Sequence, residues 1–123
     1  MRKLLIVDDE EGVRTLVRMT LNSDDYEIIE AADAAQALEL AREFHPDLVL
    51  LDVMLPDLSG LEVCRRMKAD PELAATTVVM LTARAQSSDV GDAEEAGADG
   101  YFTKPFSPIA LTQRVEEVLG GVP

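Results

Sequence analysis

Five side chains that could bind ions or carry out proton or group transfer stand directly after short apolar runs of this sequence. They are two adjacent carboxylates, a third carboxylate, a hydroxyl and an ammonium group: Asp8, Asp9, Asp52, Thr82 and Lys104. Three carboxylates brought together need positive charge, because two of them about 4 Å apart repel by roughly 4 kcal/mol at an effective dielectric constant of about 20. Lys104 supplies one positive charge, and a hard divalent cation would supply the rest.

The types of ligand indicate which cation this set would bind. A few carboxylates, with room left for water and phosphate oxygens, suit Mg²⁺ better than the many-ligand cage of Ca²⁺, and Mn²⁺ is the alternative ion. No cysteine or histidine belongs to the set, which disfavours zinc. With the cation and Lys104 in place, one carboxylate could attack a phosphoryl group and form an acyl phosphate. Asp52 is the best candidate because it ends a central strand, and Thr82 would then donate a hydrogen bond to the attached group.

These side chains can meet only if the fold brings their apolar runs side by side. Short apolar runs alternate with stretches of helical period, and we expect strands at 3–7, 26–31, 48–51, 78–81 and 100–103. The first run is continuously apolar, which predicts burial on both of its faces. Regular alternation of strands and helices predicts a parallel sheet with right-handed crossovers and helices on both sides. All five side chains would then lie at one edge, beyond the carboxyl ends of the strands.

Helix-start signals follow the second, third and fifth runs. Asp33 with Gln36, and Ser59 with Glu62, have the spacing of capping boxes. The dipeptide Ser107-Pro108 places a cap residue and a proline at the start of a last helix. These signals predict where three of the helices begin.

Two helices differ in the strength of their apolar face. In the first we expect Arg14 and Arg18 to face solvent and five residues to face the core: Val13, Leu16, Val17, Thr20 and Leu21. The helix around 88–96 has only three candidate core residues, Val90, Ala93 and Ala96, and Gly91 weakens it further. It should therefore be the helix that shifts most easily.

Composition restricts the classes of function. The chain has 24 acidic and 11 basic residues, so its net charge of −13 would repel phosphate backbones, and we expect no direct nucleic-acid binding by this domain. Its one cysteine, Cys64, excludes an internal disulfide and should be a core residue. The apolar run 4–7 is too short for a signal peptide or a membrane span, so we expect a cytoplasmic protein. The length predicts one domain, residues 1–119, with 120–123 as a C-terminal tail or the start of a linker.

Taken together, the motifs resemble the signature of two-component response-regulator receiver domains. The matching features are Asp8-Asp9 after an apolar strand, Asp52 in Leu-Leu-Asp-Val-Met-Leu-Pro, Thr82-Ala83, and Lys104-Pro105-Phe106. The likeness covers essentially the whole chain. It implies an α/β fold: a single doubly wound (βα)5 domain whose five-stranded parallel sheet has the flavodoxin-like order 2-1-3-4-5.

The resemblance also implies residue roles. Asp52 would accept a phosphoryl group from a histidine kinase or a phosphotransfer protein. Mg²⁺ would be bound by Asp9, Asp52 and the backbone carbonyl of Met54, with Asp8 binding directly or through water. Lys104 would pair with the phosphoryl group. The chain would act as a signalling switch, and not as an enzyme beyond its own phosphorylation and dephosphorylation.

Further positions concern switching and phosphoryl lifetime. By the resemblance, Thr82 and Tyr101 form a switch pair that remodels the surface of the fourth helix, fifth strand and fifth helix, and Pro105 follows a cis peptide bond. Met54 and Arg84 each stand two residues beyond a key residue. Neither offers a carboxylate or amide to orient an attacking water, so we expect a persistent phosphoryl group.

Surface charges bear on the partners. Receivers joined to winged-helix DNA-binding domains commonly carry complementary charges on the surface just named; Asp99 and Arg114 fit that pattern, whereas Asp92 and Gly100 depart from it. These charges therefore neither establish nor exclude a phosphorylation-dependent dimer, and they do not identify the downstream effector. The two arginines of the first helix are either solvated charge alone or a docking point for the upstream kinase.

Other classes of protein fit parts of the pattern. A Mg²⁺-dependent phosphohydrolase of the aspartyl-phosphate (haloacid-dehalogenase) type needs a second aspartate where Met54 stands, and a cap domain. A flavodoxin-like cofactor binder needs a loop rich in Ser, Thr and Gly after the first strand, where this chain has the acidic residues 8–11. An interaction module that is never phosphorylated in the cell is the third alternative.

Overall fold

The computed structural model describes residues 2–21, 26–82, 87–104 and 107–119, and for Thr82 and residues 87–90 it describes the backbone alone. Strands and helices alternate along these ranges. The elements are β1 (Arg2–Val7), α1 (Glu11–Thr20), β2 (Tyr26–Ala31), α2 (Ala34–Phe44), β3 (Leu48–Asp52), α3 (Gly60–Ala69), β4 (Thr77–Thr82), α4 (Ser87–Glu95), β5 (Gly100–Thr103) and α5 (Pro108–Val118).

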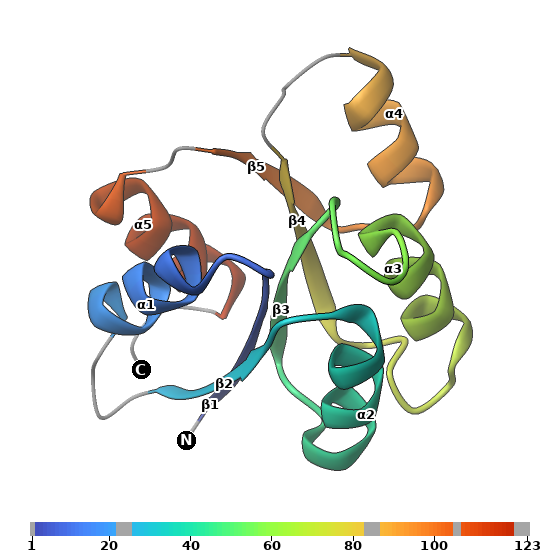
Figure 1. Ribbon diagram of the computed structural model, residues 1–123, viewed down its shortest axis with the longest axis horizontal. Coiled ribbons are helices and arrows are strands. Elements are labelled where there is room, and N and C mark those ends of the chain that lie inside the picture. The colour runs from blue at the N-terminus through green and yellow to red at the C-terminus, as the bar shows by residue number, and fades with distance from the viewer. Residues whose placement is uncertain (1, 22–25, 83–86, 105–106, 120–123) are drawn as a thin grey trace.

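The strands form one parallel sheet in the order β2-β1-β3-β4-β5, which confirms the predicted fold class and strand order. Leu4 of β1 pairs with Ile28 of β2 on one side and with Leu48 of β3 on the other. Helices α1 and α5 cover one face of the sheet, and α2, α3 and α4 cover the other (Figure 1). The winding direction reverses between β1 and β3, which is where sheets of this kind bind ligands.

The central strands are buried on both faces, as their continuous apolar runs predicted. Successive side chains of a strand point to opposite sides of the sheet. Leu5 and Val7 therefore join the core beneath α2, α3 and α4, whereas Leu4 and Ile6 join the core beneath α1 and α5. The whole of β3 is buried, including Asp52 at its end.

Two predicted helix caps form, although the return bond of the first goes to Ala32 and not to the cap residue Asp33. The Asp33 carboxylate accepts a hydrogen bond from the Gln36 N–H at 2.8 Å, and the Gln36 side chain accepts one from the N–H of Ala32 at 2.9 Å. At the start of α5, Ser107 Oγ accepts a hydrogen bond from the Ala110 N–H at 3.1 Å. These bonds satisfy N–H groups that a helix start leaves without partners.

The capping box predicted for α3 forms only in part. Ser59 Oγ accepts a hydrogen bond from the Leu61 N–H at 3.2 Å. The Glu62 side chain does not return to the cap; it pairs with Arg66 at 3.4 Å. A cation one turn further along the helix competes for that carboxylate.

The first helix meets the core along a narrower face than its pattern predicted. Val17 is fully buried, but Leu16 is 37% exposed. Adjacent residues of a helix are about 100° apart, so Leu16 lies at the margin of the face that Val17 occupies. Both arginines of this helix were predicted to face solvent. Arg18 is exposed as expected, whereas the side chain of Arg14 is largely buried.

Among the other predicted core residues, Leu21 is buried, whereas Val13 and Thr20 are only partly buried. Ala93 of α4 and Ala96 just after it are buried, and Cys64 is buried in the same core as a free cysteine. The side chain of Val90 is outside the described part of the chain. None of the helices within the described ranges is long and apolar enough to cross a membrane.

Candidate functional site

Charged side chains meet at the carboxyl ends of three strands. Asp8 follows β1, Asp52 ends β3 and Lys104 follows β5. The Nζ atom of Lys104 lies 2.6 Å from Oδ2 of Asp8 and 3.4 Å from Oδ2 of Asp52. The sheet edge thus joins two carboxylates and an ammonium group from segments that are far apart in the sequence.

Burial and neighbouring charges shift the pKa values of Asp52 and Lys104. Asp8 is fully buried and Asp52 is 4% exposed. Burial raises the pKa of the Asp52 carboxyl, and the charge of Asp8 raises it further, against the opposing effects of the Met54 N–H and Lys104. Burial works against the charge of Lys104, but its hydrogen bond to Asp8 and the charges of both carboxylates outweigh this, so the pKa of Lys104 is raised. Lys104 is therefore a cation held by two anions.

Local hydrogen bonds fix both carboxylates. The Asp8 N–H donates to the carbonyl oxygen of Ala31 at 3.1 Å, and Asp8 Oδ1 accepts a hydrogen bond from the Glu10 N–H at 2.9 Å. Asp52 Oδ1 accepts a hydrogen bond from the Met54 N–H at 3.2 Å. Each carboxylate thus uses one oxygen within its own loop and presents the other to Lys104.

Asp9 lies beside this pair, and the structure adds Glu10. Carboxylate oxygens of Asp8, Asp9 and Glu10 all lie within 4.8 Å of one another, and Glu10 is 3.8 Å from Lys104. Glu10 is the N-cap residue of α1, yet its side chain makes no capping hydrogen bond. Glu10 was not among the predicted site residues, although it stands directly after Asp8-Asp9 at a strand end.

The oxygen Oδ2 of Asp8 provides a test of whether the site fits a metal. This atom is buried, and within the described residues its close polar contact is the ion pair with Lys104. The site contains more carboxylates than the single ammonium group can neutralise. Hard oxygen ligands with surplus negative charge are what Mg²⁺ binds, so the residues present fit this ion.

Three other predicted residues lie partly or wholly outside the description. Thr82 ends β4 and is opposite Thr103 of β5 in the sheet register, but its side chain is not described. Arg84 and Pro105 are outside the described residues, and with them the predicted cis peptide bond.

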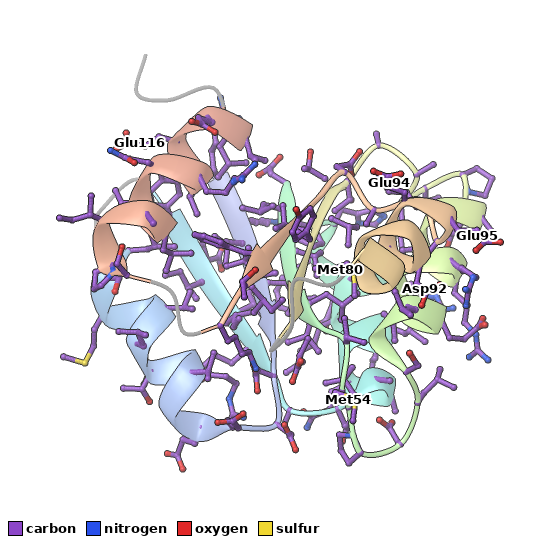
Figure 2. All side chains as sticks on the ribbon, turned by 90° about the horizontal axis from the view of Figure 1, so that it is seen from above. Met54, Met80, Asp92, Glu94, Glu95 and Glu116 are labelled. Atoms are coloured by element: carbon purple, nitrogen blue, oxygen red, sulfur yellow. The ribbon has the colours of Figure 1, made fainter. Side chains whose placement is uncertain are left out.

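Tyr101 and Met54 are both exposed near the site. Tyr101 of β5 is 39% exposed and lines two hollows, one beside Ala93 of α4 and one beside Ala110 of α5. Met54, in the loop that follows β3, is 77% exposed (Figure 2).

Helix α3 begins directly against the end of β3. The Gly60 N–H donates to the carbonyl oxygen of Val53 at 2.9 Å. A Cβ atom on Gly60 would overlap the backbone carbonyl oxygen of Asp52. Only glycine permits this approach, a requirement that the sequence did not reveal.

The loop between β3 and α3 is fastened to α2 through Asp57. Its Oδ1 accepts a hydrogen bond from the Ala34 N–H at 2.9 Å, and its Oδ2 accepts one from the Ala35 N–H at 3.0 Å. The hydrogen bond from Ala34, with that from Ala35, lowers the pKa of Asp57. The segment that carries Met54 is therefore held at both ends, by β3 and by α2.

Comparison with known proteins shows likeness over nearly the whole chain. The family model for the response regulator receiver domain matches residues 4–116. The alkaline phosphatase synthesis transcriptional regulatory protein PhoP of Bacillus subtilis is 42% identical over 118 residues, which are 96% of this chain and 48% of that protein. The phosphate regulon transcriptional regulatory protein PhoB of Pseudomonas aeruginosa is 42% identical over 118 residues, 96% of this chain and 52% of that protein. The chain spans about half the length of these curated relatives.

A solved structure shows the same likeness in three dimensions. The chemotaxis response regulator CheY4 of Vibrio cholerae matches with a TM-score of 0.90 and 31% identity, covering 96% of this chain and 98% of that one. The resemblance predicted from the motifs is confirmed. It favours the receiver interpretation over the phosphohydrolase alternative.

Proposed function

Because the chain belongs to the response-regulator receiver family, we propose that it is a phosphoryl-accepting switch whose acceptor is Asp52 and whose donor is a histidine kinase or a phosphotransfer protein. The observation that supports Asp52 is its buried carboxylate, which lies 3.4 Å from Lys104 at the edge where strand order reverses. Asp8 is the weaker candidate, since it is fully buried and Lys104 lies closer to it.

The proposed step is a single phosphoryl transfer. A carboxylate oxygen of Asp52 attacks the phosphorus atom of the donor and forms an acyl phosphate. The bond from phosphorus to the donor nitrogen or oxygen breaks, and its electron pair leaves with the donor. Lys104 lies where its charge would stabilise the oxygens of the transferring group, and chemistry of this kind depends mainly on such positioning.

The proposed cofactor is Mg²⁺, with Mn²⁺ as the alternative. Asp9, Asp52 and the backbone carbonyl of Met54 would hold the ion, with Asp8 binding directly or through water. When bound, the ion supplies positive charge to the phosphoryl oxygens. The surplus of carboxylates and the buried oxygen of Asp8 support this assignment.

Attachment of the phosphoryl group would be read out on the surface formed by α4, β5 and α5. Thr82 would move toward Asp52, and Tyr101 would fill the space that it leaves. Tyr101 lines one hollow beside α4 and another beside α5, and this position supports the role. Met54 and Arg84 would set the lifetime of the acyl phosphate, and the exposed thioether of Met54 offers no group that orients water.

A phosphorylation-dependent dimer through the same surface would use residues that already have contacts within the chain. Asp99 accepts hydrogen bonds from Lys68 Nζ and from the Val78 N–H, both at 2.8 Å. The guanidinium group of Arg114 lies 5.8 Å from the centre of the Phe102 ring. Both residues that fit the dimer charge pattern therefore already have partners within the chain.

The effector that transmits the signal would lie outside residues 1–119, and residues 120–123 would be a tail or the start of a linker. The relatives PhoP and PhoB are named transcriptional regulatory proteins. Within this domain, α4 presents the exposed acidic side chains Asp92, Glu94 and Glu95 (Figure 2), which disfavour contact with nucleic acid.

Incubation with acetyl phosphate tests this proposal. With Mg²⁺ present, the intact mass should increase by one phosphoryl group, and chelation of the metal should prevent the increase. The Asp52→Asn variant should gain nothing under either condition. Unmodified wild-type protein at saturating donor and Mg²⁺ would refute the proposed function.

A further inference from the structure

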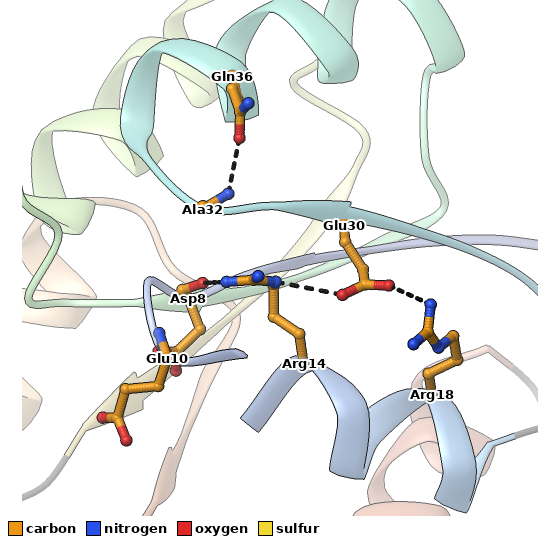
Figure 3. Close-up of polar contacts among 7 residues, drawn as sticks. All are labelled: Asp8, Glu10, Arg14, Arg18, Glu30, Ala32 and Gln36. Atoms are coloured by element: carbon orange, nitrogen blue, oxygen red, sulfur yellow. Dashed lines mark hydrogen bonds and ion pairs between the residues drawn. The ribbon is translucent and has the colours of Figure 1, made fainter. Parts of the chain in front are cut away.

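Arg14 was predicted to face solvent, but its charged side chain is largely buried. Its side chain is only 17% exposed. Its Nη1 donates to the backbone carbonyl oxygen of Asp8 at 2.7 Å, and its Nε donates to Oε1 of Glu30 at 3.2 Å. The guanidinium group thus joins the end of β1 to Glu30 of β2 (Figure 3).

Glu30 is shared by two arginines of α1. The Nη1 atom of Arg18 donates to the other oxygen of Glu30 at 2.7 Å. Arg18 is 56% exposed, and the described part of the chain shows no contact between it and Asp8. The two arginines therefore have the same acidic partner and differ in the contact to Asp8 (Figure 3).

Arg14 contacts the peptide group between Asp8 and Asp9 directly, through the carbonyl oxygen of Asp8. The preceding peptide group is held by the sheet, because the N–H of Asp8 donates to the carbonyl oxygen of Ala31. Because the peptide bond is planar, the carbonyl of Asp8 and the N–H of Asp9 turn as one unit. The bond from Arg14 thus sets the direction in which the chain enters Asp9.

The backbone of Arg14 holds the other end of the same segment. Its N–H donates to the carbonyl oxygen of Glu10 at 3.3 Å, in the first turn of α1. The acidic segment 8–10 is therefore held at Asp8 by the Arg14 side chain and at Glu10 by the first turn of α1, where the Val13 N–H also donates to the Glu10 carbonyl oxygen at 3.1 Å.

We propose that Arg14 is a positioning residue that holds the peptide group between Asp8 and Asp9, and with it the Asp9 carboxylate, in the orientation that binds Mg²⁺; this rests on the function proposed above. A purely electrostatic role predicts the opposite effect. A cation beside a metal site repels the metal, so removal of the arginine charge alone would tighten binding. Positioning predicts weaker binding, and outer partners of metal ligands typically contribute about 10- to 100-fold in affinity.

The variants Arg14→Met and Arg18→Met form a matched pair. Each removes one positive charge from α1 and one ion pair with Glu30, but only the first removes the contact to Asp8. In calorimetric titrations of the purified chain with Mg²⁺, we expect Arg14→Met to bind at least about tenfold more weakly than wild type. Arg18→Met should stay within about twofold of wild type, as a change at an exposed ion pair does.

A second measurement needs no metal. In nuclear magnetic resonance spectra of the metal-free protein, the Asp9 amide signal should shift in Arg14→Met and keep its position in Arg18→Met. If Arg14→Met does not fold, Arg14→Lys replaces it in both measurements with the same expectation. Lysine keeps the charge but lacks the fork that reaches Asp8 and Glu30 together.

The outcomes separate this inference from the proposed function. Wild-type protein that binds no Mg²⁺ would overturn both. Wild-type binding, with an affinity of Arg14→Met equal to or tighter than that of Arg18→Met, would overturn the role of Arg14 alone.

Discussion

Lys104 Nζ lies 2.6 Å from Oδ2 of Asp8, a carboxylate that is fully buried. Its distance to Oδ2 of Asp52 is longer, at 3.4 Å. In the metal-free protein the lysine therefore serves first as the counter-ion of Asp8. A metal bound to Asp8 would take over that task and leave Lys104 free to face a phosphoryl group on Asp52.

Replacement of Lys104 by methionine tests this exchange of counter-ions. Without metal, Lys104→Met leaves two buried carboxylates without their cation, and we expect a loss of about 3–5 kcal/mol in the free energy of unfolding. Added Mg²⁺ should stabilise this variant more than it stabilises wild type, because the metal has no lysine to displace. Urea denaturation with chelator and with Mg²⁺ measures both effects.

Lys68→Met is the control for this experiment. Lys68 is also a partly buried lysine, ion-paired with Asp99 at 2.8 Å away from the site. It should lose stability but respond to Mg²⁺ as wild type does. An equal response to Mg²⁺ in Lys104→Met and wild type would contradict the proposed exchange of Lys104 for the metal as counter-ion of Asp8.

A methyl group on Gly60 should displace the start of α3. The added Cβ would overlap the carbonyl oxygen of Asp52 and crowd Val53, and backbone atoms cannot turn away as a side chain can. We expect Gly60→Ala to lose at least about 2 kcal/mol in denaturant unfolding. Gly91→Ala in α4 is the contrast, since a Cβ there meets no atom within 4 Å. It should gain about 0.5–1 kcal/mol, and equal stability of the two variants would refute this explanation.

The Asp57 carboxylate should protect two amides of α2 from hydrogen exchange. Asp57→Asn should speed exchange at Ala34 and Ala35, whereas Asp33→Asn should speed it at Gln36, because each carboxylate binds its own N–H groups. The lowered pKa of Asp57 also sets the sign of the pH effect. Its stabilisation is present above the usual value of 3.8 and is lost as the pH falls through the lower folded value. A stability difference between Asp57→Asn and wild type that persists unchanged in acid would count against this contact.

The arrangement of strands and the meeting of Asp8, Asp52 and Lys104 could be predicted because they depend on repetitive rules. Apolar runs and capping signals located the elements, and parallel strands necessarily end at one edge of a sheet. Predicting that these three residues meet at one edge of the sheet required no knowledge of side-chain geometry.

The contacts that hold the site could not be predicted in the same way. The burial of Arg14 depends on Glu30 standing opposite α1 on β2, and the role of Asp57 depends on α2 starting within its reach. These are tertiary distances between segments that no local pattern relates. The exposure of Leu16 has a similar cause, since periodicity gives a direction around the helix but not the width of the face that the sheet covers.

Burial of Cys64 predicts a loss of stability in alkaline solution. Burial raises the pKa of its thiol to about 11, whereas the usual value is 9.0. Between these values the unfolded chain loses a proton that the folded chain keeps, so the free energy of unfolding falls as the pH rises. Relative to Cys64→Ala, which lacks the thiol, wild type should become steadily less stable between pH 9.0 and about 11 in urea titrations. A constant difference across that interval would argue against a buried thiol.

Chemical location of the phosphoryl group identifies the acceptor residue. Borohydride reduces an acyl phosphate to an alcohol, so phosphorylated aspartate becomes homoserine, which tandem mass spectrometry can place in the sequence. After treatment with acetyl phosphate and Mg²⁺, we expect homoserine at position 52 alone. Homoserine at position 8 or 9, or a reduced product at Glu10, would contradict the assignment of Asp52 as the acceptor.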